Sequence, residues 1–379
     1  MRRFLSCLLL YISALAAQPS NRELIGQIDD TLADLAKVTG LPVKGTVDRE
    51  FITREKLKDF LQTRINESIK PEELRIEELT LKLFGFVPPS YDLKASTISL
   101  LTEQAAAFYD YRKKKMFLLE GAPEISQRFV LIHELAHALA DQHFTLEKYI
   151  QQGRNDDSAT ARMAVMEGQA QWLMYEVMAQ KTGQSLRKDQ SMVRMFVNAS
   201  SVGLSDYPEL SKAPLYIRES LLFPYTKGLV FQQEVIERLG NKGFREVFAR
   251  PPSNTRQILH PALYFEKAKP AKARAPKLPG DYTELTDGDF GEFDIHVLIQ
   301  QHTDEETADK LAPRWRGGRY RVGEHKSSKK PALTYALAFD SADAAGQFES
   351  FYKAKVAPSK SAARLARKGA AVQITEGLE

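Results

Sequence analysis

The fold is decided at residues 129–143, which read FVLIHELAHALADQH. The run from Ile125 to His143 contains neither Gly nor Pro and is rich in good helix formers, so the sequence predicts a helix there. On this helix His133 and His137 lie one turn apart on one face, where two imidazoles can occupy adjacent corners of a zinc tetrahedron. Glu134 lies roughly 100° around the helix from His133, beside such a metal and not on it.

The spacing H-E-x-x-H is a known zinc-binding pattern. In that pattern the glutamate holds and deprotonates a zinc-bound water, which is general-base chemistry. The competing interpretation is a surface helix whose two histidines merely lie on its polar face. We favour metal binding, and that interpretation requires the chain to supply a third ligand.

A catalytic zinc ion takes three protein ligands and keeps a fourth position open for water. One candidate is His143, which follows His133 by ten residues, as does the last histidine of the metzincin signature HExxHxxGxxH. In that signature a glycine breaks the helix, but this chain has Ala140 at the glycine position. If the helix continues, His143 points about 240° away from His137.

The other candidate is Glu167, within residues 161–174, which read ARMAVMEGQAQWLM. This stretch is typical of a second, largely buried helix with a single acid, and acids are almost never fully buried unpaired. A zinc ion would be its partner, so we expect Glu167 to complete a site with one Zn2+ per chain. Gly168 is costly inside a helix, and close approach of the two helices would explain it.

These residues resemble a known group of enzymes. HELAH at 133–137 followed by EGQA at 167–170 resembles the gluzincin branch of zinc metallopeptidases, the thermolysin-like clan whose third ligand is a downstream glutamate. HELAHALADQHF, EGQA and ILHP at 258–261 are similar to exported bacterial proteins described as neutral zinc metallopeptidases. The resemblance implies a zincin-like fold, bound zinc and hydrolysis of a peptide or protein substrate, and we expect an endopeptidase.

One position departs from the thermolysin-like pattern, which places an aspartate four residues after the ligand glutamate. Here that position is Gln171. The group that hydrogen-bonds a zinc-binding imidazole is therefore expected elsewhere, and the candidates are Asp141, Asp156 and Asp157.

The tetrahedral intermediate of hydrolysis needs a donor for its developing oxyanion besides the metal. Tyr225 and His260 are the candidates, and the resembling proteins have Tyr and His in these contexts. Each of these residues is also common as a packed or capping side chain. Their roles are therefore hypotheses that depend on where the fold places them.

Residues 1–17 have the pattern of a secretory signal peptide, with two arginines, a short apolar run and small residues before the cleavage position. We expect a secreted or periplasmic protein, and the alternative is an uncleaved membrane anchor. The apolar run is too short to span a bilayer. Cys7 is the only cysteine, so the mature chain has no disulfide and no cysteine metal site. The formal charge of +4 gives no electrostatic case for nucleic-acid binding.

The predicted fold class is α+β, mainly helical, with two domains. Residues 18–265 are predicted to form a zincin-like catalytic domain that includes a helical layer over residues 20–105. Residues 106–120 have the pattern of a β-hairpin just before the HExxH helix. Its edge strand is either a binding site for extended substrate or purely structural.

The C-terminal third is predicted to be a separate unit. Residues 266–280 alternate Lys or Arg with Ala and Pro, which is typical of a solvated linker. Residues 281–358 are predicted to form a small α/β accessory domain, with strands at 320–322 and 332–339. Residues 359–379 are basic and Ala-rich, and we expect a flexible tail.

The combined prediction is an exported zinc-dependent peptidase with Glu134 as general base. The main alternative is a catalytically inactive zincin-fold binding protein of the cell envelope. A third possibility is a metallohydrolase that acts on a non-peptide bond, because the same metal chemistry serves several reactions.

Overall fold

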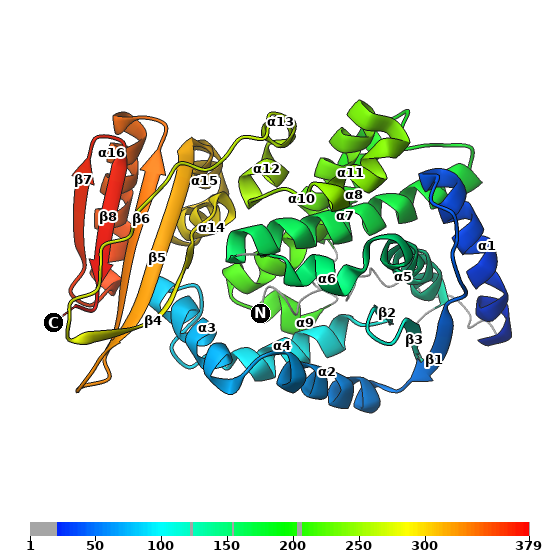
Figure 1. The fold of residues 1–379 in the computed structure, drawn as a ribbon, viewed down its shortest axis with the longest axis horizontal. Helices are drawn as coiled ribbons and strands as arrows, with labels where there is room; N and C mark the ends of the chain where they lie inside the picture. The colour runs from blue at the N-terminus through cyan, green and yellow to red at the C-terminus, as the bar shows by residue number, and fades with distance from the viewer. Residues whose placement is uncertain (1–20, 122–123, 154, 203–206, 379) are drawn as a thin grey trace.

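A computed structural model of the chain describes residues 21–121, 124–153, 155–202 and 207–378. The fold is α+β, with a larger, mainly helical part up to Phe265 and a smaller C-terminal part built on a five-stranded sheet. The two parts lie side by side along the longest axis of the molecule (Figure 1). The predicted signal peptide lies outside the described residues.

The N-terminal helical layer has the predicted form. It consists of α1 (Asn21–Thr39), α2 (Arg54–Ser68), α3 (Pro71–Phe84) and α4 (Leu93–Gln104). Thr53 caps α2, where its side chain accepts a hydrogen bond from the Lys56 N–H at 3.3 Å. Pro71 begins α3, and Gly85 ends it in the left-handed conformation with a φ of 77°.

The hairpin predicted at residues 106–120 is present as two antiparallel strands, β2 (Ala107–Asp110) and β3 (Lys115–Leu119). A third strand, β1 (Asp48–Ile52), was not predicted and pairs parallel with β3. The sheet order is β1-β3-β2, so β2 is an edge strand. This strand lies directly against α5 (Glu124–Phe144), the HExxH helix.

Three long helices form the centre of the larger part: α5, α7 (Asp156–Lys181) and α10 (Leu215–Leu239). α7 packs against both of the others. α10 begins at Leu215 and continues through Pro224. Apolar side chains on both sides of Pro224 are buried, and this burial outweighs the missing backbone hydrogen bond. The surrounding short helices are α6 (Leu146–Gln151), α8 (Gln190–Val202), α9 (Pro208–Lys212), α11 (Gly243–Ala249), α12 (Thr255–Leu259) and α13 (Pro261–Phe265).

The close approach inferred at Gly168 exists, but with a different helix. A Cβ atom at Gly168 would lie 2.2 Å from the carbonyl carbon of Gly228 in α10. A Cβ atom at Gly228 would lie 2.2 Å from the Ala164 carbonyl oxygen in α7. The interpretation that Gly168 accommodates the HExxH helix is therefore wrong. It failed because the sequence did not show that α10 passes over the other side of α7.

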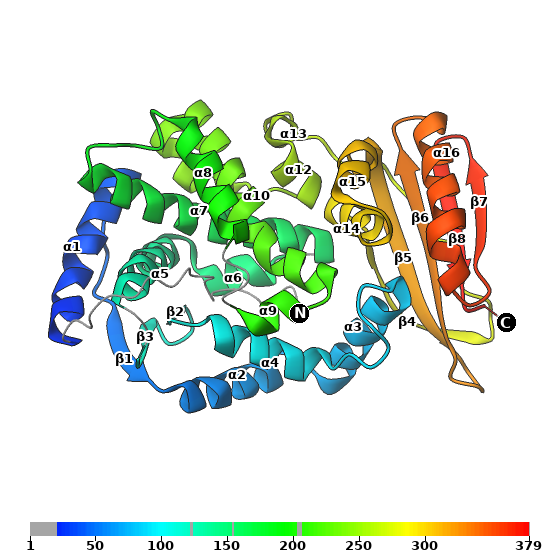
Figure 2. The ribbon, with the colours of Figure 1, turned by 180° about the vertical axis from the view of Figure 1, so that it is seen from behind.

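The C-terminal part is a five-stranded antiparallel sheet in the order β4-β5-β6-β8-β7. The helices α14 (Glu292–His302), α15 (Glu305–Leu311) and α16 (Ala342–Phe351) lie on one face of it (Figures 1 and 2). The strands are β4 (Tyr282–Asp289), β5 (Trp315–His325), β6 (Pro331–Phe339), β7 (Arg364–Lys368) and β8 (Ala371–Glu376). The two predicted strands correspond to β5 and β6.

The prediction of a flexible tail after Ser359 is wrong. β8 pairs with β6 inside the sheet, and β7 forms its edge. Val372 and Ile374 are fully buried at alternate positions of β8, as expected of a strand with one covered face. The Ala- and Lys-rich composition around this segment hid the alternation.

The linker over residues 266–280 is less solvated than predicted. It crosses the sheet face opposite the helices, and the Ala271 N–H donates to the Arg316 carbonyl oxygen at 2.7 Å. A Cβ atom at residue 317 would lie 2.1 Å from the Ala271 carbonyl oxygen, so Gly317 allows this approach.

Within the described part of the chain, no helix has both the length and the hydrophobicity needed to cross a bilayer.

Candidate metal centre

Three potential metal ligands converge between α5 and α7. The Nε2 atoms of His133 and His137 are 2.9 Å apart, and they lie 3.1 and 3.2 Å from Oε2 of Glu167. The two histidines share one face of α5 at i and i+4, and Glu167 comes from the facing helix α7. All three side chains are at most 1% exposed.

The spacing of these three atoms fits a small tetrahedral metal. Zinc bonds of about 2.0–2.1 Å to nitrogen and oxygen place neighbouring ligand atoms about 3.3 Å apart. The observed separations of 2.9 to 3.2 Å are close to that edge length. Two nitrogens and one carboxylate oxygen are also the donor set of catalytic zinc sites that keep a fourth position open.

The charge states of His133 and Glu167 suit metal binding, because metal ligands must be deprotonated. Burial lowers the pKa of His133 to about 4, so its imidazole is neutral. Burial alone would raise the pKa of Glu167, but the two adjacent imidazoles hold it at about 2. Burial of His137 disfavours its protonated form, whereas the nearby Glu167 carboxylate favours it. The effect of the carboxylate is larger, so the pKa of His137 is raised.

Glu134 lies beside the ligands and is held by the hairpin. Its Oε2 accepts a hydrogen bond from the backbone N–H of Tyr109 in β2 at 2.7 Å. Its Oε1 is buried and has no hydrogen-bond partner among the described residues. Burial raises the pKa of Glu134 to about 8, although the nearby His137 lowers it. The carboxyl group therefore has one fixed oxygen and one free oxygen, as a group that transfers protons requires.

Gln171 occupies the position next to His133 that an aspartate fills in the thermolysin-like pattern. It lies one turn after Glu167 on α7, and its side chain interacts with the His133 imidazole. Nδ1 of His133 and Oε1 of Gln171 are both buried, and neither has a hydrogen-bond partner among the described residues. The Gln171 amide nitrogen donates to the Tyr175 hydroxyl at 2.8 Å, which leaves the amide oxygen for the imidazole.

The expectation that an aspartate would take this role is not met. Asp141 accepts hydrogen bonds from the Tyr109 hydroxyl at 2.9 Å and from the Lys114 ammonium at 2.5 Å. Asp141 therefore ties the hairpin to α5. The other two candidates lie at the N-terminus of α7, about 16 Å along the helix axis from the ligand glutamate.

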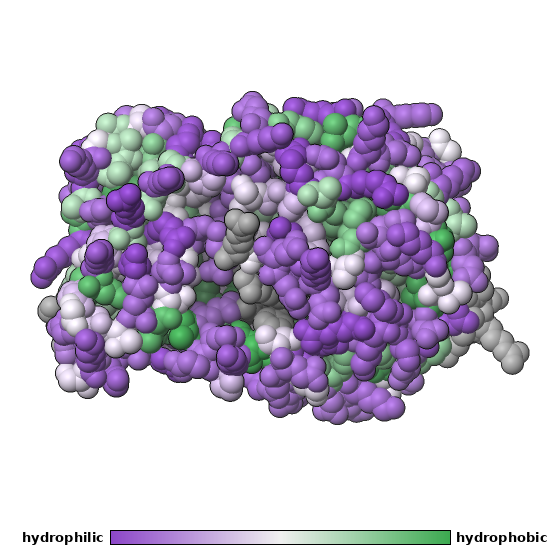
Figure 3. All heavy atoms as spheres, viewed as in Figure 1, coloured by the Kyte–Doolittle hydropathy of each residue, from purple (hydrophilic) through white to green (hydrophobic). Residues whose placement is uncertain are grey.

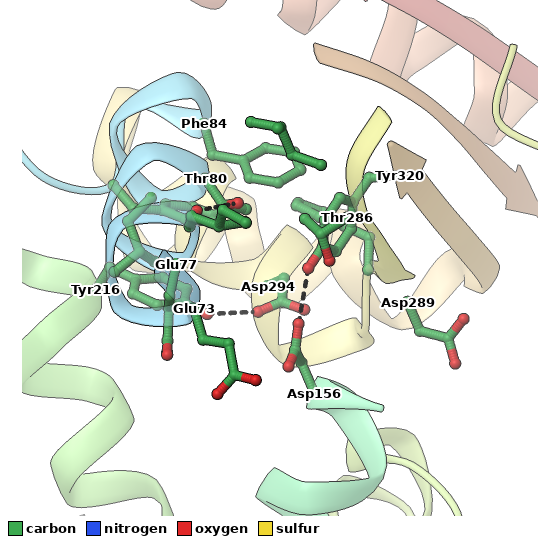
Figure 4. A pocket seen from close by; sticks show the side chains of 15 residues that line it. Glu73, Glu77, Thr80, Phe84, Asp156, Tyr216, Thr286, Asp289, Asp294 and Tyr320 are labelled. Atoms are coloured by element: carbon green, nitrogen blue, oxygen red, sulfur yellow. Dashed lines mark hydrogen bonds between the residues drawn. The ribbon is translucent and has the colours of Figure 1, made fainter. Parts of the chain in front are cut away.

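Asp156 and Asp157 instead connect α7 to the C-terminal part. The Tyr320 hydroxyl donates to Asp156 at 2.7 Å, and the Thr255 hydroxyl donates to Asp157 at 2.6 Å. Asp156 lines a pocket of about 230 Å³ between α3, α7, α10 and β4, whose lining includes aromatic side chains such as Phe84 and Tyr320 (Figure 4). Figure 4 also shows Asp294 bonded to the Tyr216 hydroxyl, at 2.8 Å. Asp156 and Asp157 therefore stabilise the junction between the two parts.

Of the remaining predicted site residues, one lies beside the metal-ligand group and two lie elsewhere. Tyr225 of α10 is buried, and its ring centroid lies 6.0 Å from that of His133. His260 lies between α12 and α13, and its Nε2 is 2.6 Å from a carboxylate oxygen of Glu292 in α14. His143 is directed away from the ligands, with its Nε2 2.8 Å from the Pro42 carbonyl oxygen. The structure thus brings Tyr225 to the site and gives His260 a partner in the C-terminal part.

Sequence reasoning missed two contributors to the site. The backbone N–H of Tyr109 has no sequence signature, because any residue at that strand position supplies the same donor. Gln171 could have been found from its i+4 spacing to Glu167, had a neutral amide been considered in place of a carboxylate.

The comparisons with known proteins agree with this geometry. The model of the IrrE N-terminal-like domain, in the peptidase M78 family, matches residues 92–196. This segment contains all three potential ligands and Glu134. No curated protein and no solved structure matches the chain. Residues 92–196 are therefore similar to a zinc metallopeptidase-like domain.

Proposed function

We propose that the protein is a zinc-dependent peptidase. The observation that carries the proposal is the convergence of His133, His137 and Glu167 around one point, with the unpaired Oε1 of Glu134 beside them. The similarity of residues 92–196 to a peptidase family model supports the same reaction class. Zinc is favoured over a harder metal because two of the three ligands are imidazoles.

The side chains of the site have distinct roles in this proposal. A zinc ion, when bound, supplies Lewis acidity that polarises a carbonyl group and acidifies a water molecule. Glu134 takes a proton from the attacking water at its free Oε1 and returns that proton to the leaving amine. The Tyr109 N–H fixes the other carboxylate oxygen, so the base needs no reorientation between the two transfers. Tyr225 is the candidate donor to the oxyanion, because its ring is next to His133.

The hairpin suggests how a peptide would bind. β2 is the edge of its sheet, and its Tyr109 N–H is directed away from β3 and toward Glu134. An extended peptide added beside this edge would gain main-chain hydrogen bonds next to the general base. We therefore propose that the edge strand binds substrate. We also propose export directed by residues 1–17, which mass spectrometry of protein recovered outside the cytoplasm would test.

The test combines elemental analysis with hydrolysis of a generic protein substrate. The wild-type chain is expected to hold one zinc, Glu167→Ala to lose it, and His143→Ala to keep it. Glu134→Gln should keep zinc while the rate falls about 10²–10⁴-fold, the usual contribution of a general base. Full activity of Glu134→Gln would refute the role assignment. Stable zinc without hydrolysis of any peptide would favour the zincin-fold binding protein.

A further inference from the structure

The C-terminal sheet has one face that no helix covers. The helices lie behind the sheet in the view of Figure 1, and the linker crosses in front of it. The Thr334 hydroxyl of β6 donates to the Pro276 carbonyl oxygen at 2.7 Å, and the Gln373 amide of β8 donates to the Arg274 carbonyl oxygen at 3.4 Å. These contacts identify the linker side of the sheet as the face that carries Thr334 and Gln373.

The strand register places two cations of β7 on this same face. Residues directly opposite each other in neighbouring strands share a face. Arg364 is opposite Thr375, which is opposite Thr334, and Lys368 is opposite Ala371. Arg364 and Lys368 are both exposed. They are therefore on the linker side, whereas Arg367 pairs with Glu349 of α16 on the helix side.

The linker adds four more exposed cations to this face. We use the name basic face for the linker and β7 cations together: Lys269, Lys272, Arg274, Lys277, Arg364 and Lys368. None of these six side chains has an ion pair with another described residue. Neither residues 267–280 nor β7 contains an acid. The basic face is thus a concentration of unneutralised positive charge on a chain whose formal charge is only +4.

At the other edge of the sheet, formed by β4 and β5, the arginines of β5 are neutralised by acids of β4. Arg319 pairs with Asp289 at 2.8 Å, and Arg321 pairs with Glu284 at 2.5 Å. On this face of the sheet, the unpaired cations therefore lie on the linker and β7 and not on β5.

A hollow of about 890 Å³ borders the start of the linker. Lys269, Lys272 and Arg274 line it together with Arg250, whose guanidinium pairs with Glu246 at 2.7 Å. Trp315 also lines the hollow, and its buried indole N–H has no acceptor among the described residues. The two acids of the hollow are already engaged, one by Thr255 and one by Arg319. The free groups of the hollow are therefore cations and a hydrogen-bond donor, which suit a phosphate group.

We propose that the basic face binds an anionic phospholipid surface. The cations are spread over one side of a sheet, so that many can face a membrane plane together, and the hollow can take a headgroup phosphate. Figure 3 shows hydrophilic residues projecting from this part of the molecule, with hydrophobic patches between them. Single-stranded nucleic acid is a poorer match because residues 267–280, β7 and β8 contain no aromatic side chain on which bases could stack.

Juxtamembrane lysines and arginines act almost independently on an anionic bilayer. Each contributes about a fivefold gain in affinity, and the effect falls off within a Debye length of about 8 Å at physiological salt. Arg364 lies one strand away from the strand that contacts Arg274, so these charges are within that range. The inference does not depend on the peptidase proposal, since it involves none of the metal ligands.

The test is co-sedimentation of the full chain with vesicles. Wild-type protein should bind vesicles of phosphatidylcholine with phosphatidylglycerol and not vesicles of phosphatidylcholine alone. The triple variant Lys272→Gln, Arg274→Gln and Arg364→Gln should lose about a hundredfold in affinity. A matched control, Lys56→Gln, Lys181→Gln and Lys242→Gln, removes the same charge from exposed positions elsewhere and should change affinity by no more than a few fold.

Each outcome decides the proposal. Equal losses in the two triple variants would show that net charge alone drives binding and would overturn it. Absence of binding to the anionic vesicles would also overturn it. Tighter binding to single-stranded DNA or to free inorganic phosphate, with displacement from vesicles, would assign the face to those ligands instead. Zinc content, measured in parallel, should be unchanged in all variants.

Discussion

The crossing of α7 and α10 at two glycines leads to a quantitative prediction. A methyl group at Gly168 would lie 2.2 Å from the carbonyl carbon and 2.3 Å from the carbonyl oxygen of Gly228, where ordinary contact begins at 3.4 Å. Both are backbone atoms, so no side chain can rotate away. The Gly168→Ala variant must therefore separate the two helices by about 1 Å, in a core that is close-packed.

The expected cost follows from two opposing terms. Alanine is favoured over glycine in a helix by about 1 kcal/mol. Overpacking of a core costs about 1–3 kcal/mol and more when backbone must move. Because α7 and α10 have the most extensive contact of any two elements in the fold, we expect the upper end or beyond. The net loss should be about 2 kcal/mol or more, which lowers the Tm by about 4–8 °C for a part of this size.

Gly346→Ala is the matched control. Gly346 lies in α16, and a Cβ atom there would have nothing within 4 Å. Only the helix propensity acts, so this variant should gain about 0.5–1 kcal/mol. Both variants are compared with wild type by thermal denaturation in the presence of a chelator, which removes the stabilisation that bound metal adds. A Gly168→Ala variant as stable as wild type would refute the close-packing argument.

Three further predictions concern polar groups. Gln171→Leu removes the acceptor beside His133 and should weaken zinc binding about 10–100-fold in chelator competition. Tyr109→Phe removes the hydroxyl bonded to Asp141 and should cost about 1–3 kcal/mol in chemical denaturation while zinc content stays the same. Lys360→Met removes the ammonium group that lies 3.4 Å from the buried carboxylate of Glu376. Burial raises the pKa of Glu376, and Lys360 partly offsets this rise. A carboxyl group whose pKa is raised in the folded state contributes stability at pH below its unfolded pKa of about 4.3, and this stability is lost as the pH rises through its folded pKa. The variant should therefore be as stable as wild type at about pH 4.3. Near neutral pH, where Glu376 is charged and buried without its partner, its free energy of unfolding should be about 3 kcal/mol lower. Equal deficits at both pH values would contradict this assignment.

Much of the metal site was predictable because its determinants are local. The i, i+4 spacing of His133 and His137 defines their common face on any continuous helix. The absence of a helix breaker at Ala140 predicted that His143 points elsewhere, and its contact with the Pro42 carbonyl is consistent with this. Helix ends such as Thr53 and Gly85 are local in the same sense, since a cap involves only residues one turn apart.

The errors arose where a residue's role depends on a distant segment. Gly168 faces α10 and not the HExxH helix, and the choice between two neighbouring helices is not encoded within α7 itself. The segment after Ser359 has little hydrophobic content, and β8 is ordered because β6 offers it an open edge. The linker likewise packs on a sheet surface that no local pattern reveals.

The sequence by itself determined the helices, the hairpin and the two imidazoles on one helix face, because these depend on dihedral preferences and on spacings within a few residues. Only the tertiary structure decided that Glu167 meets those imidazoles, that the Tyr109 N–H holds Glu134, and that the cations of the linker and β7 share one face. The physical reason is range. Such contacts join residues tens or hundreds of positions apart, and the packing of the whole core determines which of them form.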